Sequence, residues 1–368
     1  MHFAGHEEYS DMKKMTSLSV CFTFTGCFLG AGYVSGQELY QFFGAFGGAG
    51  IVGLFAAVAL LGILNLMLVR IVRSTRDARI DHAVVGTENR FLLFLVGAVE
   101  MIIFFGTYVV MAAGAGALLE SLTGLRGAHI WGAFVFCTVI SFLAVRGIAG
   151  LVRIFSAVVP LLILVTVAVG VAATVIYAGN GLTFRPSEIK NPLIPNAATG
   201  AVTFASYNFF CSIGILCPVG LAVKNRRAAV LGTVYGCVTL VFVAFSVLFS
   251  LAAFPQAASA GLPMLAAAQS LSPVLTVIYA ALLILAMSGA SLACLVPTVT
   301  YFAEKFTGAE KHGAALTFGA SGIAFLLSCF GFSDLVGTVF SSFGYLSLFA
   351  VFGVIRHAAA CAKPKAQP

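Results

Sequence analysis

The chain has 368 residues, of which 60% are hydrophobic and only 9% are charged; its mean hydropathy is +1.05 and its formal net charge is +7. Charged residues make up about 25% of an ordinary soluble domain, so this composition excludes one and predicts a polytopic membrane protein. The basic residues are spread over many short segments rather than gathered into one patch, which argues against a nucleic acid partner.

Apolar stretches of about 20 residues are long enough to cross the hydrocarbon core of a bilayer as helices. We therefore expect an all-α protein in the lipid bilayer, with ten transmembrane helices near residues 16–45, 47–69, 91–119, 130–145, 154–178, 197–221, 228–252, 273–303, 314–331 and 335–355.

These helices fall into two groups of five, residues 16–178 and 197–357. Residues 179–196 separate the groups, contain three prolines, and are expected to form an extracellular loop. Residues 1–15 are polar and acidic, unlike a secretory signal, and are expected to form a cytoplasmic leader. Residues 358–368 are expected to form a cytoplasmic tail.

The distribution of positive charge predicts the orientation of the helices. Lys and Arg accumulate in short cytoplasmic loops. With the N-terminus inside, ten spans place only Arg126, Arg185 and Lys190 of the 20 basic residues on the outer face, and the other 17 on the inner face. A miscounted span would mix the two sets, so we expect both termini in the cytoplasm of a bacterium, with the protein in the inner membrane.

The first span contains an unusual polar stretch, residues 30–38, which reads Gly-Ala-Gly-Tyr-Val-Ser-Gly-Gln-Glu. Each glycine weakens a helix by about 1 kcal/mol relative to alanine, and a carboxylate at membrane depth costs at least about 2.5 kcal/mol. Unpaired backbone groups cannot face lipid. The stretch therefore predicts a broken helix that faces a cavity or a ligand.

The sixth span repeats this pattern, with Ser206, Tyr207 and Asn208 at mid-span and Pro218 further on. We expect it to be interrupted as well. Two interrupted helices, each opening a group of five, are typical of inverted-repeat transporters with a binding site at the membrane midplane.

Tyr33 and Gln37 in the first span and Tyr108 in the third are further candidates for the site, together with Ser206, Tyr207 and Asn208. The alternative is that these polar groups form hydrogen bonds between helices, which is common in membranes.

Two carboxylates are candidates for coupling. An intramembrane acid is a functional hypothesis by default, so Glu38 is expected to bind a substrate amine or to carry a coupling proton; the alternative is that it caps the broken helix. Glu100 could carry a proton too, or it could pair with Arg90 or Arg146. Asp334 is expected to be a loop or helix-start carboxylate.

Ten helices in two groups of five, with the first and sixth interrupted, resemble the LeuT-type fold of the amino acid, polyamine and organocation transporter superfamily. The stretch from Gly30 to Glu38, followed by Phe42 and Phe43, is similar to the first-helix signature of the YkvI-like membrane proteins, a bacterial branch of amino acid permeases.

The resemblance implies roles for further residues. Gly26-Cys27-Phe28-Leu29-Gly30-Ala31-Gly32 has the glycine spacing of the first-helix break in LeuT-type sodium symporters. By this resemblance, backbone amides near Gly30 and Gly32 would receive a substrate carboxylate, next to Tyr108. The carbonyls of Gly26 and Leu29 would face a sodium ion, together with the hydroxyls of Ser288 and Ser291.

The sequence therefore predicts a secondary active symporter, without an organic cofactor, for a small amine- or carboxylate-bearing solute such as an amino acid, coupled to Na⁺ or H⁺. A ligand-sensing receptor on the same fold is the alternative. A channel is disfavoured because no ring of like charge or filter repeat is visible. An enzyme is not expected, because all six histidines lie in termini or loops and no nucleophile–base pair or metal motif is present.

Overall fold

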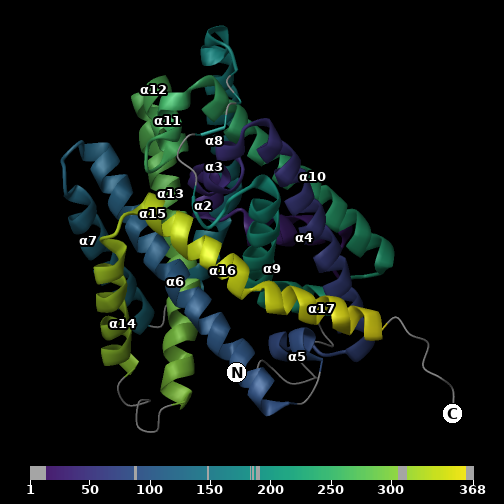
Figure 1. Ribbon diagram of the computed structural model, residues 1–368. Helices are drawn as coiled ribbons and strands as arrows, with labels where there is room; N and C mark the ends of the chain where they lie inside the picture. The colour runs from purple at the N-terminus through teal and green to yellow at the C-terminus, as the bar shows by residue number, and fades with distance from the viewer. Residues whose placement is uncertain are drawn as a thin grey trace, which may run out of the picture.

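The structure is a computed structural model that describes residues 14–86, 89–146, 149–182, 184, 186–187, 191–305 and 313–361. The described residues are almost entirely helical (Figure 1). Eight helical stretches are long and apolar enough to cross a membrane, and two shorter apolar helices, α1 (Ser17–Phe28) and α14 (Gly313–Ser328), fall in the first and ninth expected spans. The all-α membrane fold and its ten expected segments are confirmed.

The long helices match the expected spans to within a few residues at most ends. They are α4 (Gly48–Thr75), α6 (Arg90–Thr123), α7 (Ala128–Val145), α8 (Ala149–Tyr177), α9 (Ala197–Ala222), α10 (Arg226–Ala253) and α13 (Pro273–Lys305). Short helices fill three connections: α5 (Ile80–Val85) follows α4, η2 (Ala178–Asn180) follows α8, and α11 (Pro255–Ala258) and α12 (Pro263–Leu271) follow α10.

The first span is broken, as predicted. It consists of α1, α2 (Ala31–Val34) and α3 (Gln37–Phe42), and ends in the 3-10 turn η1 (Gly44–Phe46). Gly30 is extended between α1 and α2. Gly36 has a φ of 84° between α2 and α3, a left-handed conformation that glycine adopts without the steric cost of a side chain.

The prediction of an interrupted sixth helix is wrong, because α9 is continuous through all the polar residues at its centre. Their side chains are satisfied by the preceding turn: the Ser206 hydroxyl donates to the Val202 carbonyl at 2.7 Å, and the Asn208 amide donates to the Phe204 carbonyl at 3.1 Å. Such local bonds let polar residues remain in a helix. Pro218 lies in the last turns of α9, and the helix continues past it.

The tenth span is irregular instead. It runs through α15 (Phe332–Leu335), the π-helical turn η4 (Val336–Phe340), α16 (Ser341–Leu346) and α17 (Leu348–Ala360). π-Helical turns occur frequently at functional sites.

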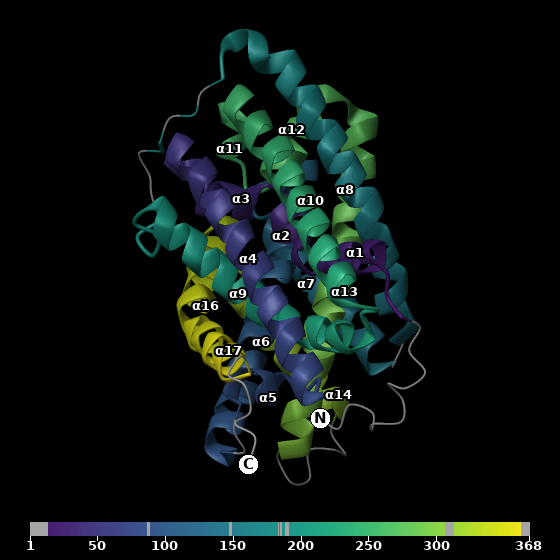
Figure 2. The same cartoon turned by 90° about the vertical axis from the view of Figure 1, so that its right-hand side faces the viewer.

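The packing of the helices reflects two repeats of opposite orientation. In the first span, α1 packs on α10, which is the seventh span. In the sixth span, α9 packs on α4, which is the second span. The two contacts are equivalent, because each joins the first helix of one group of five to the second helix of the other group. Contacts between α6 and α13, and between α4 and α10, join equivalent helices of the two repeats. Figure 2 shows α4 and α10 near the middle of the view, with α9 beside α4 and α1 beside α10.

Both described ends of the chain lie on the face of the bundle that carries α5. Met15 forms backbone hydrogen bonds with Ala222 and Lys224 at the turn between α9 and α10. The end of α17 packs on α5, where the His357 ring bonds the Ala83 carbonyl at 3.1 Å. We call this face the α5 face, and the opposite one, at the top of Figures 1 and 2, the α12 face.

Candidate functional site

The centre of the candidate site is Glu38, in the first turn of α3, whose side chain is only 4% exposed. Its carboxylate accepts a hydrogen bond from the Tyr207 hydroxyl and a second, at 3.3 Å, from the Asn208 amide. Both donors belong to α9. No described Lys, Arg or His forms an ion pair with Glu38. The structure thus brings three predicted site residues together and leaves the carboxylate without a neutralising cation.

The backbone of the helix break closes on this carboxylate. A Cβ atom built on Gly32 would lie 2.7 Å from Glu38 Oε2, closer than a real Cβ allows. Only glycine at position 32 permits this contact without a shift of the carboxylate. Gly30, by contrast, is exposed, and a Cβ there would meet nothing within 4 Å.

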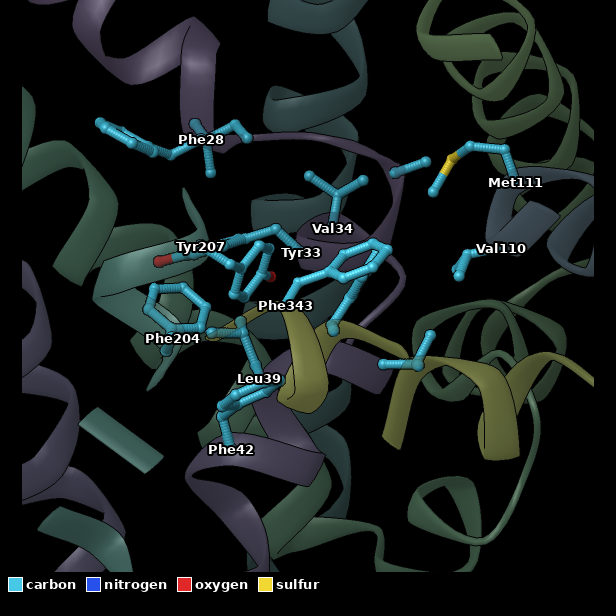
Figure 3. Packing of buried hydrophobic residues seen from close by; sticks show 14 of the residues in the cluster. Phe28, Tyr33, Val34, Leu39, Phe42, Val110, Met111, Phe204, Tyr207 and Phe343 are labelled. Carbon is cyan, nitrogen blue, oxygen red and sulfur yellow. The ribbon is translucent and has the colours of Figure 1, made fainter. Parts of the chain in front are cut away.

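Aromatic rings surround the hydroxyl that binds Glu38. The Tyr207 ring stacks on Phe340 of η4, with centroids 5.2 Å apart and an interplanar angle of 18°. Phe42 and Phe204 lie against it, each with its centroid 5.9 Å away. Figure 3 shows Tyr207 close to Phe204 and Tyr33, with Phe42 below them. The carboxylate therefore lies in a low-dielectric environment in which electrostatic interactions are strong.

Two predicted tyrosines bond elsewhere. The hydroxyl of Tyr33 donates to the Leu240 carbonyl of α10 at 2.8 Å, and that of Tyr108 bonds Ser321 Oγ of α14 at 2.9 Å. Both side chains are buried. They form the hydrogen bonds between helices that the sequence left open as the alternative, and their role in binding stays a prediction.

Gln37 points to the tenth span. Its amide nitrogen donates to Ser333 Oγ at 2.6 Å, and its buried amide oxygen has no partner among the described residues. Gln41, one turn on, also reaches Ser333. Beside them, Asn191 donates to the Gly337 carbonyl of η4 at 2.6 Å. Sequence reasoning missed this polar contact of the first span with the tenth. The recurrence of Gln four residues apart, on one helix face, was the available signal.

Ser206 lies in α9 just before Tyr207, but its hydroxyl bonds the Val202 carbonyl and not Glu38. The second predicted acid, Glu100, is half-buried on α6. The proposed coupling role of Glu100 stays a prediction.

Of the residues expected to hold sodium, Gly26 and Leu29 lie at the end of α1, and Ser288 and Ser291 lie on α13. The Leu29 amide bonds the Thr25 carbonyl and the Gly30 amide bonds the Phe28 carbonyl, so the regular helical pattern stops there. On α13, Ser291 is fully buried, and its hydroxyl has no partner among the described residues, whereas Ser288 bonds the Ile284 carbonyl at 2.8 Å. A buried hydroxyl without a partner is costly, and oxygen donors are what hard cations require. Ser291 therefore fits an oxygen-lined cation site, and the assignment of Gly26 and Leu29 stays a prediction.

No cluster of three or more His, Cys, Asp or Glu side chains that could hold a metal occurs in the part of the chain that the structure describes. A site for a monovalent cation needs no such cluster of side chains, because carbonyl and hydroxyl oxygens can be its ligands.

Two groups of five membrane helices, with a break in the first span, agree with the LeuT-type fold that the sequence resembles. Comparison with solved structures supports this class. MhsT in complex with L-phenylalanine matches with a TM-score of 0.62 at 17% identity, over 97% of this chain and 94% of that one. Mhp1 in an inward facing conformation matches with a TM-score of 0.62 at 13% identity, over 94% of this chain and 77% of that one.

A mutant of the manganese transporter of Eremococcus coleocola matches with a TM-score of 0.59 at 14% identity, over 94% of this chain and 82% of that one. Neither a family model nor a curated protein matches the sequence. At these identities the matches show the fold alone, and the resemblance to the YkvI-like family stays a prediction.

Proposed function

We propose that the protein is a secondary active transporter of a small solute that carries an amine, a carboxylate or both, with an amino acid as the first candidate. The observation that carries the proposal is the buried Glu38 carboxylate at the break of the first span, which is bonded to Tyr207 and Asn208 and has no cationic partner among the described residues. A negative charge that is buried without a partner is costly, so a bound proton or a positively charged group stabilises such a carboxylate. The relatives in the fold class whose names state a function are transporters, not enzymes.

The contacts of the break suggest how the site opens and closes. α3 is joined to α9 through Glu38 and to the tenth span through Gln37, while the Ser35 carbonyl between α2 and α3 accepts from the Met264 amide of α12 at 2.9 Å. Each contact consists of one to three hydrogen bonds between elements. Rocking of the first and sixth spans together against the rest of the bundle would exchange the contacts to the tenth span and to α12 without unfolding a helix, and would keep the Glu38 contact between the two moving spans.

The coupling ion is proposed to be Na⁺ or H⁺. The hydroxyl of Ser291, which has no partner in the described part of the chain, supports a cation site that we propose to be completed by the carbonyls of Gly26 and Leu29. Glu38 and Glu100 are the groups that could carry a proton instead. The two alternatives differ in one measurable respect, the ion whose gradient drives uptake.

We further propose that the α5 face is cytoplasmic, in the inner membrane of a bacterium. The helix ends and turns on this face carry the described basic residues Lys14, Arg70, Arg73, Arg76, Arg79, Arg90, Arg146, Lys224, Arg226, Arg227 and Arg356, whereas the turn between α6 and α7 on the α12 face carries Arg126. This asymmetry is the one expected of an inward-facing positive surface.

Ligand-induced stabilisation would test the proposed function. The thermal stability of the purified protein should be measured against a panel of amino acids, amines and small carboxylates, in sodium and in choline buffer, each at two pH values. A ligand that binds only the folded state adds about 2.7 kcal/mol at a hundred times its dissociation constant.

Stabilisation that strengthens with sodium would identify the solute and assign coupling to the Ser291 site. Stabilisation that responds to pH and not to sodium would assign it to Glu38 or Glu100. Absence of any response to amines, carboxylates or amino acids would contradict the proposed substrate class.

A further inference from the structure

A large apolar groove lies outside the candidate site, between α6, the end of α13, α14 and the tenth span. Its volume is about 970 Å³. Its lining is apolar apart from a few polar groups, among them Thr338 of η4 and the carboxylate of Asp334. Figure 1 shows these elements on the side facing the viewer, where α15 and α16 cross in front of α6.

The groove opens on the side of the helix bundle, among exposed apolar side chains. Its rim includes large exposed side chains, such as Ile102 at 56% and Phe330 at 69%, whereas Met101, Val109 and Phe343 at its floor are buried. The lining residues of α6 run from position 94 to 109, which at 1.5 Å per residue is about 22 Å. The length and apolar lining of the groove fit an acyl chain better than water.

Asp334 is out of place in these surroundings. Its side chain is exposed, it lines the groove, and it belongs to a stretch, Phe332–Ala360, that is long and apolar enough to span the membrane. No ion pair of Asp334 is present among the described residues. Asp334 lies in the first turn of α15, just after α14, as expected for a helix-start carboxylate. A carboxylate beside an apolar groove is stabilised by a positively charged partner.

We propose that the groove is a specific lipid site that takes a phospholipid with a primary amine headgroup, such as phosphatidylethanolamine. One acyl chain lies along α6 in the groove, and the ammonium group donates hydrogen bonds to the Asp334 carboxylate. A phosphatidylglycerol headgroup carries net negative charge and would be repelled. A phosphatidylcholine headgroup has a positive charge but no N–H to donate, so it forms the weaker contact.

The site has a direct route to the candidate binding centre. Thr338 and Val339, which line the groove, belong to the π-helical turn η4. The next residue, Phe340, stacks on Tyr207, and the Gly337 carbonyl of the same turn accepts from Asn191. A lipid seated in the groove therefore contacts the turn that supports the Glu38 cluster. This inference does not depend on which solute is transported.

The test uses the full-length protein purified in detergent, to which phosphatidylethanolamine, phosphatidylcholine or phosphatidylglycerol with identical acyl chains is added. Thermal stability and native mass spectrometry report binding. Asp334→Asn removes the charge, and Ala98→Trp fills the groove. Glu120→Gln is the matched control, because Glu120 lies near the end of α6 toward the α12 face, bonded to His129, and does not line the groove.

We expect phosphatidylethanolamine to stabilise the wild type most and to remain bound. Asp334→Asn should weaken its binding by about fivefold or more, and should remove the preference over phosphatidylcholine. Ala98→Trp should reduce the binding of all three lipids, and Glu120→Gln should change nothing. Equal binding of the three lipids by the wild type, an unchanged preference in Asp334→Asn, or a protein dimer that Ala98→Trp dissociates would overturn the proposal.

Discussion

At the scale of the residue, the account depends on one carboxylate. Glu38 is bonded by a hydroxyl and an amide, both of which can serve a charged or a protonated carboxyl group. It therefore has a stable arrangement with or without a cation beside it. A residue that exchanges a proton, a substrate amine or both during a cycle needs this property.

Replacement of Tyr207 by Phe tests the role of the hydroxyl. Loss of a hydrogen bond to a buried carboxylate should lower the free energy of unfolding by about 1.5–3 kcal/mol. The ligand affinity, measured from ligand-induced stabilisation, should fall at least tenfold. Tyr345→Phe is the control, because its hydroxyl bonds the Leu193 carbonyl on the exposed surface. A loss of stability with unchanged ligand affinity would make Tyr207 a purely structural partner of Glu38.

The sequence was sufficient to single out Glu38, Tyr207 and Asn208, which the structure brings into contact, because polar groups at mid-span are costly in lipid. Their role in binding stays a prediction. The sequence did not distinguish Tyr33 and Tyr108, which bond other helices, from these three residues. These tyrosines occupy similar positions in apolar helices, and only the rotation of each helix determines that their hydroxyls meet α10 and α14.

At the scale of the element, the break of the first span depends on glycine, as predicted. The sixth span shows why the same argument failed there. Its polar residues are Ser, Tyr and Asn, whose side chains bond within the helix or to α3, so that its backbone never has to open. The irregular tenth span was missed, because a π-helical turn arises from tertiary contacts such as the Asn191 bond to Gly337 and leaves no composition signal.

Replacement of Gly32 by Ala tests whether the break positions the carboxylate. The added methyl group would overlap Glu38 Oε2 and displace it. We expect folding to be retained, because the clashing atom ends a flexible side chain, and ligand-induced stabilisation to be lost. Gly322→Ala in α14 is the matched control, since its Cβ would meet nothing within 4 Å. Normal ligand binding by Gly32→Ala would show that the close contact has no role.

At the scale of the whole molecule, two inverted repeats meet at α9 and the first span, and the ten-segment pattern was predictable from hydropathy and charge alone. Hydropathy locates spans because backbone groups in lipid must be paired within helices. The packing of α1 on α10 and of α9 on α4 was not predictable in this way, since lipid-facing and protein-facing surfaces have similar composition.

The most direct test of the central claim is uptake into proteoliposomes of the solute that stabilises the protein most. It should be measured under an inward sodium gradient, an inward proton gradient and no gradient, with wild type, Glu38→Gln and the control Glu120→Gln. The account predicts gradient-driven accumulation by wild type and Glu120→Gln, and its loss or decoupling in Glu38→Gln. Binding without accumulation in the wild type, or unchanged coupled uptake by Glu38→Gln, would contradict it.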